Sequence, residues 1–310
     1  MWLYYCLLST VIWGFVAIAI KKCSNNEPKR IAILGMLIYH LSMILISLII
    51  KPQIIANLSV IDMIKMLPGI LIQSIGFYCS ISAIKYGKVA ITSSIQRAQV
   101  IVTFLLGILI LRERFTILQL IISGVLVTLS IMLSRDKKND EEKINKKSKQ
   151  KAIMYSWGVV LFYGVSDFIN KIYITEFQSP LYVMFNYAVI IIIGIFVYCL
   201  ISKNWNYIDI RKINNKRYFI LQALLDIASS IFNRFALLDG NVSIVSIIST
   251  SSIIVTILAS RLILKERISW KKYIVVFGIF ICVLLLSLIT NRKAYIKEYI
   301  NENHRNGNKQ

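Results

Sequence analysis

Apolar blocks of about 20 residues alternate along the chain with short charged segments. A helix of about 20 apolar residues spans the roughly 30 Å hydrocarbon core of a bilayer. Continuous apolar runs without strict alternation favour helices over a closed barrel, and only these two structures satisfy every backbone group in lipid. The pattern predicts an all-α membrane protein with ten transmembrane helices, at residues 2–20, 31–50, 66–84, 89–111, 115–134, 153–174, 180–202, 217–237, 242–264 and 270–290.

The longest polar break, RDKKNDEEKINKKSKQK, divides these helices into five and five. Such a charged stretch is typical of a solvated linker. We therefore expect a first five-helix unit at 1–134, a charged linker loop at 135–151, a second five-helix unit at 152–290 and a polar C-terminal tail at 291–310.

The two units are related in sequence. When the first is shifted by 153 positions, residues 87–114 align with 240–267, and the identities include Gly87/Gly240, Val89/Val242, Ser93/Ser246, Thr103/Thr256 and Glu113/Glu266. The pairs Trp13-Gly14 and Trp157-Gly158 also open the two halves in parallel. An odd number of helices per unit inserts the second copy upside down, which predicts two inverted repeats, as in many secondary transporters.

The block AIKYGKVAITSSIQRAQVIVTFLLGILILRERFTILQLIISGVLVTL, with its second copy at 234–286, resembles an EamA-type repeat of the drug/metabolite transporter (DMT) superfamily. The hallmark of that repeat is a turn of the type Gly-Glu-Arg between two helices. This chain departs from it, because Arg112 and Lys265 stand where the family has glycine. The resemblance covers both halves, and it implies a 5+5 bundle around a central cavity that exports or exchanges metabolites such as amino acids.

The glutamates of this turn, Glu113 and Glu266, have two interpretations. They either form a gate at the membrane face or anchor the helix that follows, because a carboxylate is stabilised near the positive end of a helix. We favour anchoring.

Composition narrows the class of protein. The chain is 57% hydrophobic, has a mean hydropathy of +0.67 and carries a net charge of +21. The basic residues stand at block ends and in the central loop, as in membrane proteins, and no domain-sized soluble segment remains to bind nucleic acid. We expect a multi-pass protein of the cell (inner or plasma) membrane whose partners are the lipid bilayer and a small-molecule substrate, not nucleic acid. The sequence allows a monomer or a homodimer.

Several kinds of chemistry are absent from the sequence. The five cysteines form no CxxC pair, and the two histidines have no partner at ligand spacing, so we expect no metal site and no cofactor. There is no phosphate-binding GxxxxGK[ST] motif, no GxSxG and no HExxH. We therefore expect a carrier driven by a gradient or a simple facilitated exchanger, not an enzyme or an ATP-driven pump.

Ionisable groups inside a transmembrane helix are costly and mark functional sites. Arg97, Asp167 and Asp226 are the three that stand out. At 1.5 Å per residue, Arg97 and Asp226 lie at nearly equal depth and Asp167 lies roughly 8 Å deeper. The sequence thus favours Asp226 over Asp167 as a partner of Arg97. Both aspartates are candidates for proton coupling.

The acids belong to polar stripes at helical spacing, which must face the protein interior or water. We expect the predicted helices one, three, four, six, eight and nine to line a polar cavity. The substrate-binding candidates are Trp13, Gln73, Tyr78, Ser93, Arg97, Tyr163, Asp167, Asn170, Gln222, Asp226, Ser229, Asn233, Ser246 and Thr250.

These features predict a secondary transporter that exports or exchanges small polar metabolites, such as amino acids or amines, by alternating access. Two alternatives stay open at this stage. A flippase for lipids or lipid-linked sugars requires a cavity that opens sideways to lipid. A non-transporting membrane scaffold subunit predicts that the polar stripes tolerate alanine.

Overall fold

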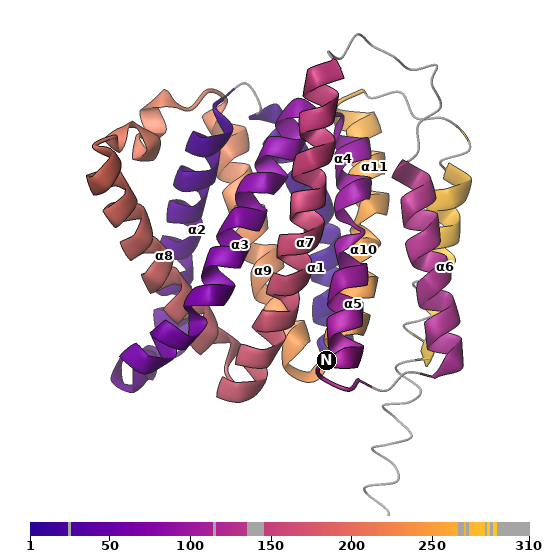
Figure 1. Cartoon of the computed structure of the whole chain (residues 1–310), viewed down its shortest axis with the longest axis horizontal. Helices are drawn as coiled ribbons and strands as arrows, with labels where there is room; N and C mark the ends of the chain where they lie inside the picture. The colour runs from indigo at the N-terminus through magenta and orange to yellow at the C-terminus, as the bar shows by residue number, and fades with distance from the viewer. Residues whose placement is uncertain are drawn as a thin grey trace, which may run out of the picture.

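The computed structural model describes residues 1–23, 26–113, 116–134 and 146–265, together with 270, 273–282, 284–285 and 288–289. These residues form helices and turns, and no strand occurs among them. The first half contains α1 (Trp2–Lys22), α2 (Pro28–Ile50), the short η1 (Pro52–Asn57), α3 (Val60–Tyr86), α4 (Val89–Gln96), α5 (Gln99–Leu109) and α6 (Ile117–Ser134) (Figure 1).

The second half repeats this order. It contains α7 (Lys146–Phe177), α8 (Pro180–Ser202), the short η3 (Trp205–Ile208) and η4 (Ile210–Lys212), α9 (Lys216–Asp239), α10 (Val242–Thr250) and α11 (Ser252–Ile263). In Figure 1, α1 starts at the lower face, where the N-terminus lies, and α7 starts at the upper face. The first helices of the two halves therefore run in opposite directions, as the odd number of predicted helices requires.

Seven stretches of the described residues are long and apolar enough to cross a membrane: 2–22, 28–50, 60–86, 147–177, 180–202, 216–239 and 242–263. Shorter apolar helices lie at Gln99–Leu109, Ile117–Leu126 and Tyr273–Cys282. Large apolar side chains such as Leu45, Leu161 and Ile201 face outward over these helices, as expected of surfaces in contact with lipid. The chain is thus a multi-pass membrane protein, and the total of ten spans stays a prediction.

Two predicted continuous helices are interrupted. The helix expected at 89–111 breaks into α4 and α5 at Arg97 and Ala98, and the one expected at 242–264 breaks into α10 and α11 at Ser251. At both breaks the backbone forms i→i−3 hydrogen bonds, which are tighter than those of an α-helix. The Ala98 N–H donates to the Ile95 carbonyl and the Ser251 N–H donates to the Ile248 carbonyl. Near the second break, hydroxyls of the Thr250–Ser252 run donate to carbonyls three residues earlier, which competes with regular helix bonding.

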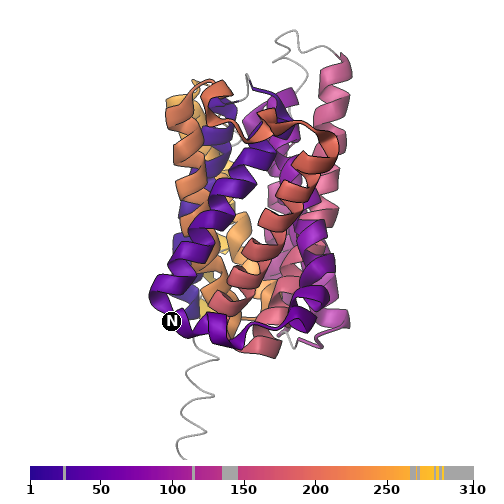
Figure 2. The same cartoon turned by 90° about the vertical axis from the view of Figure 1, so that its left-hand side faces the viewer.

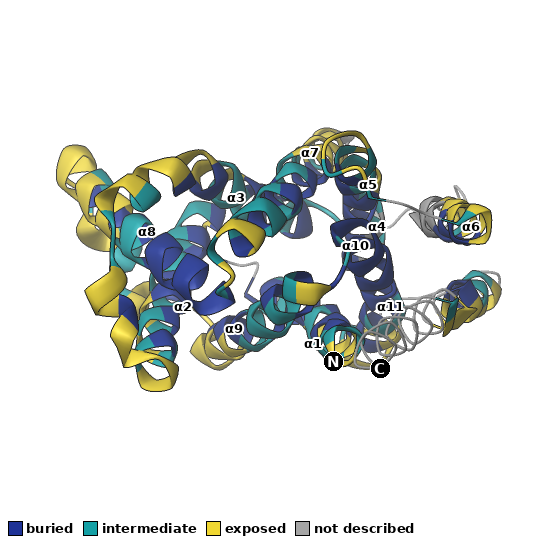
Figure 3. Ribbon diagram, turned by 90° about the horizontal axis from the view of Figure 1, so that it is seen from below, coloured by how far each residue is buried: buried dark blue, intermediate teal, exposed yellow. Residues whose placement is uncertain are grey.

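The two halves interlock with approximate two-fold symmetry. α1 packs along α9 and α11, while its counterpart α7 packs along α3 and α5, and α2 contacts α8. Figure 2 shows the helices as one bundle, and Figure 3 shows α10 almost wholly buried among its neighbours. Every residue of α10 is buried.

The predicted register of the first helix of each half is wrong. Lys21 donates to the carbonyls of Ile84 and Gly87, and Lys171 donates to those of Leu237 and Gly240. The acceptors are 153 positions apart but the lysines are 150 apart, so Trp13-Gly14 corresponds to Tyr163-Gly164, not to Trp157-Gly158. Trp157 is 58% exposed, and a bulky apolar side chain of this kind belongs on a lipid-facing surface as readily as in a core.

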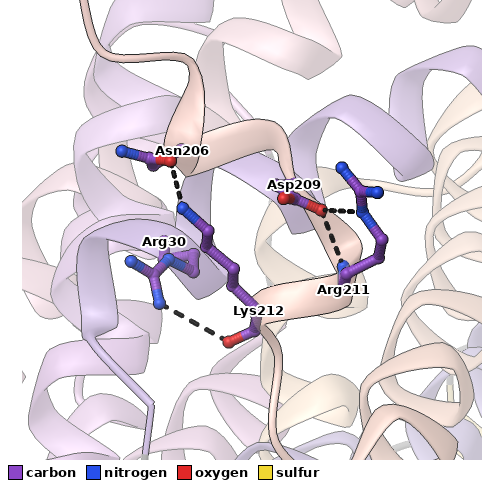
Figure 4. A network of polar contacts seen from close by, with 5 residues as sticks. All are labelled: Arg30, Asn206, Asp209, Arg211 and Lys212. Carbon is purple, nitrogen blue, oxygen red and sulfur yellow. Dashed lines mark hydrogen bonds and ion pairs between the residues drawn. The ribbon is translucent and has the colours of Figure 1, made fainter.

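The upper face is tied together by the segment between α8 and α9. Arg30, near the start of α2, donates to the carbonyl of Lys212, whose own ammonium group contacts Asn206 (Figure 4). Arg211 donates to Asp209 from its backbone and side chain, and these bonds hold the pKa of the Asp209 carboxyl below its ordinary value. This network fixes one end of the bundle above the functional region.

Candidate functional site

A cavity with a volume of about 90 Å³ lies between the two halves. A single water needs roughly 10–15 Å³ of such volume, so the space accommodates several water molecules or a small polar solute. In the described part of the chain, six helices contribute to its wall, namely α1, α2, α3, α7, α8 and α9. The lining residues are Trp13, Met36, Tyr39, His40, Gln73, Ser74, Phe77, Tyr163, Ser166, Asp167, Asn170, Ile191, Asp226, Ser230, Asn233 and Arg234.

Both intramembrane aspartates reach this cavity. Asp167 projects from α7, and it interacts electrostatically with Arg234 and, more weakly, with Arg97. Asp226 projects from α9 and accepts a hydrogen bond from Gln222 Nε2 at 3.3 Å. A carboxylate in this setting is costly unless a cation or a proton joins it. The two acids therefore give the cavity an affinity for cationic groups or protons.

Arg234 is a cavity residue that the sequence did not single out. Its guanidinium donates from Nη1 to Asn170 Oδ1 at 3.1 Å and from Nη2 to Gln73 Oε1 at 3.3 Å. The predicted helix ended at residue 237, which made Arg234 look like an ordinary cation at the membrane face. α9 in fact continues to Asp239. The polar stripe offered a signal, because Arg234 lies eight positions after Asp226 and so shares its helix face.

Arg97 lies beside the cavity without lining it. It is 8% exposed, and its guanidinium carbon is 5.9 Å from the ring centroid of Trp13, which does line the cavity. The described residues include no ion pair to Arg97 within 4.0 Å. Its electrostatic partner is Asp167, not the favoured Asp226. Depth along the helices could not reveal this, because α4 packs laterally against α7.

The predicted substrate-binding residues fall into two groups. Trp13, Gln73, Tyr163, Asp167, Asn170, Asp226 and Asn233 share the cavity wall. The others lie outside it: Tyr78 packs edge-on against Tyr155, Gln222 and Ser229 are buried next to Asp226, and Ser93, Ser246 and Thr250 are buried in α4 and α10. The wall also includes α2 and α8, which the sequence did not indicate. Among the residues that the structure describes, it includes none of α4, α5, α10 or α11.

The turn that follows α5 joins the two halves. The carboxylate of Glu113 accepts hydrogen bonds from the backbone N–H groups of Val242 and Ser243, at 2.7 and 3.2 Å, and from the Ser243 hydroxyl. Glu113 thus caps a helix N-terminus. The helix is α10 of the other half, however, not the following helix as expected. Glu266, its counterpart, lies outside the described residues.

Arg112 and Lys265, which replace the family's glycine, share an unusual backbone conformation. Their φ angles are 52° and 55°, in the left-handed region that favours glycine because it has no Cβ. The departure from the hallmark turn is therefore one of side chain only. The backbone shape that glycine serves is kept at both equivalent positions.

Comparison with known proteins agrees with this architecture. A family model described as the EamA-like transporter family matches residues 1–135 and 150–288. A curated relative from Methanocaldococcus jannaschii, "Uncharacterized protein MJ1333.1", is 33% identical over 137 residues, which are 44% of this chain and 96% of the relative. A solved structure titled "Crystal structure of protein" superposes with a TM-score of 0.69 at 12% identity, covering 93% of this chain and 97% of that one.

The last of these likenesses shows a shared fold alone, but the family match covers both halves. The sequence resemblance is confirmed on nearly the whole length of the chain, and with it the membrane location that the apolar helices indicate. The chain belongs to the EamA-like transporter family of the drug/metabolite transporter superfamily.

Proposed function

We propose that this protein exports or exchanges small polar metabolites, such as amino acids or amines, by alternating access across the cell membrane. The observation that carries the proposal is the cavity between the halves, whose wall brings together Asp167, Asp226 and Arg234. Buried charges of both signs are expensive in a membrane protein, and they mark substrate or ion pathways. A scaffold protein would gain nothing from maintaining them.

The arrangement of the halves supports alternating access. Two inverted units that meet around one site can exchange conformations, which exposes the site first to one face and then to the other. The interrupted helices α4–α5 and α10–α11 stand at equivalent places in the two halves. Tightened turns inside a helix often mark hinges, and we propose that these turns bend during the exchange.

The test is transport by the purified protein in liposomes, screened with labelled amino acids and amines. We expect uptake that rises with counter-substrate inside the vesicles, and a loss of at least tenfold in D226N and D167N. The matched control is D209N, which makes the same change at a partly buried loop residue outside the cavity. If both cavity variants transport as well as the parent, the charged cavity is scaffolding and the proposal fails.

A further inference from the structure

We propose that Arg234 forms a carboxylate-binding subsite, so that the transported molecule lies along α9 with its carboxylate on Arg234 and an ammonium group on Asp226. The inference rests on the proposed transport function and deepens it. It selects zwitterionic substrates over simple amines, and it gives the substrate a direction in the cavity.

Arg234 is held in place by neutral groups. The side chain is 5% exposed, its two Nη atoms donate to the amide oxygens of Asn170 and Gln73, and its guanidinium carbon lies 5.0 Å from the ring centroid of Tyr187. These two bonds and a further side-chain hydrogen bond to Tyr39 leave part of the five N–H donors of the guanidinium without a described partner. These contacts fix the orientation of the guanidinium before any ligand binds.

The charge of Arg234 is not matched by direct contact. The described residues place no carboxylate within 4.0 Å of it, although Asp167 attracts it from farther away. A buried charge without a partner is destabilising. A planar guanidinium whose hydrogen-bond partners are all neutral can offer its remaining N–H groups to a carboxylate, and guanidinium groups commonly bind carboxylates through two parallel hydrogen bonds.

The surroundings favour a carboxylate over a phosphate. Arg234 supplies one positive charge, and the nearby Asp167 repels an anion more strongly the greater the charge of that anion. A phosphate monoester brings up to two negative charges, so one would remain uncompensated in a medium of low polarity. A carboxylate brings one charge, which the guanidinium balances.

Asp226 supplies the opposite pole. It precedes Arg234 by eight residues on α9, which is roughly 12 Å along the axis. Both side chains lean toward the helix N-terminus, and the longer arginine side chain reaches farther in that direction, which shortens the gap. Ser230 lines the cavity between them. The described side-chain partner of Asp226 is Gln222, a neutral group. An ammonium group therefore fits at Asp226 when the carboxylate occupies Arg234.

The experiment measures a preference, not only a rate. Liposomes with the full chain are assayed for uptake of leucine, lysine and phenylalanine against their decarboxylated amines, isoamylamine, cadaverine and phenethylamine, and for β-alanine against O-phosphoethanolamine. We expect the parent to favour at least one amino acid tenfold or more over its amine, and β-alanine over the phosphate ester. R234M should reduce the amino-acid preference to about twofold or less, and R234K should keep part of it. The exposed R211Q is the charge-matched control and should keep all of it.

The outcomes separate the two proposals. Equal or better uptake of the amines by the parent overturns the carboxylate subsite and leaves transport standing, and so does a preference for O-phosphoethanolamine. No uptake of any probe by well-folded parent protein rejects the transport function itself. Because R234M removes a buried contact, its folding is checked by its thermal unfolding midpoint. If it does not fold, the preference of the parent and of R234K decides.

Discussion

The side-chain hydroxyl of Thr256 donates a hydrogen bond to the backbone carbonyl of Gly14, 2.9 Å away. The same bond occurs in the other half, where the hydroxyl of Thr103 donates to the carbonyl of Gly164 at 3.0 Å. Each bond joins the first helix of one half to the broken helix of the other. The sequence repeat thus has a structural counterpart: the first helix of each half packs against the broken helix of the other half, through the same hydrogen bond.

Both glycines should be sensitive to a single added methyl group. A Cβ at Gly14 would lie 2.7 Å from Val255 Cγ1, and one at Gly164 would lie 2.6 Å from Val102 Cβ. We expect G14A and G164A to lower the free energy of unfolding by about 1–3 kcal/mol, the usual cost of overpacking. Thermal unfolding of the detergent-solubilised protein measures the effect.

The control is G194A in α8, because a Cβ there would meet no atom within 4 Å. Alanine is favoured over glycine inside a helix by up to about 1 kcal/mol, so G194A should unfold at the parent temperature or above. Equal losses in all three variants would refute the close helix contacts.

Several parts of the fold could be predicted from hydropathy alone. The helix expected at 180–202 coincides with α8, and Pro180 occupies the first turn, where its missing N–H is harmless. Hydropathy reports only the part of a helix that lies in lipid, however. The helix expected at 153–174 extends back to Lys146, because charged residues can continue a helix into water.

The site could be predicted only in part. Asp167 and Asp226 are visible in the sequence because a charge inside an apolar run has few explanations. Hydropathy does not show which helices are lateral neighbours. The favoured pairing of Arg97 with Asp226 is wrong because α4, which ends at Arg97, packs against α7, the helix that carries Asp167. Arg234 was missed because it stands near the end of its apolar run, where cations are ordinary. The wall residues of α2 and α8, such as Tyr39 and Ile191, carry no sequence signal of their own.

The turn that lacks the family's glycine should gain stability when glycine is restored. Arg112 and Lys265 have positive φ angles. This conformation is unfavourable for a residue with a Cβ atom, and glycine adopts it without that steric cost. We expect R112G and K265G each to raise the free energy of unfolding by up to about 1 kcal/mol. K51G is the control, because Lys51 is exposed and has a φ of −142°. K51G should lower the thermal unfolding midpoint or leave it unchanged. If R112G and K265G lower the midpoint as well, the explanation is wrong.

Glu113 should contribute to stability as a cap between the halves. Replacing it with glutamine keeps the size of the side chain but removes the charge that the N-terminus of α10 favours, so we expect E113Q to cost about 1–2 kcal/mol. The control is E176Q, which removes an exposed ion pair with Lys65 at 3.4 Å and should cost less than about 1 kcal/mol. Urea or thermal unfolding compares the two, and a smaller loss in E113Q than in E176Q would argue against the cap.

Lys171 and Lys21 should act on opposite faces. Each holds the C-terminal carbonyls of a neighbouring helix, those of α9 for Lys171 and those of α3 for Lys21. If these contacts close the two ends of the cavity, K171M should raise the labelling rate of a cysteine introduced at Ser230 several-fold from the face of Gly240. K21M should raise it from the face of Gly87. A cysteine-free background and the exposed K65M serve as controls, and labelling that rises from the same face in both variants would contradict opposed latches.

The two aspartates should differ in their effect on proton coupling. Asp167 lies near two arginines, Arg234 and Arg97, whereas the described residues give Asp226 no cationic neighbour. The carboxylate of Asp226 is met only by the neutral Gln222 among the described side chains, so we expect a transported cation or a proton to balance its charge. We expect D226N to abolish the acceleration of uptake by an imposed pH gradient while exchange at equal pH persists at a reduced rate. D167N should reduce both processes by a similar factor. Uptake rates of labelled substrate with and without the gradient measure the ratio, and a gradient response that survives in D226N but disappears in D167N would assign the proton to Asp167 instead.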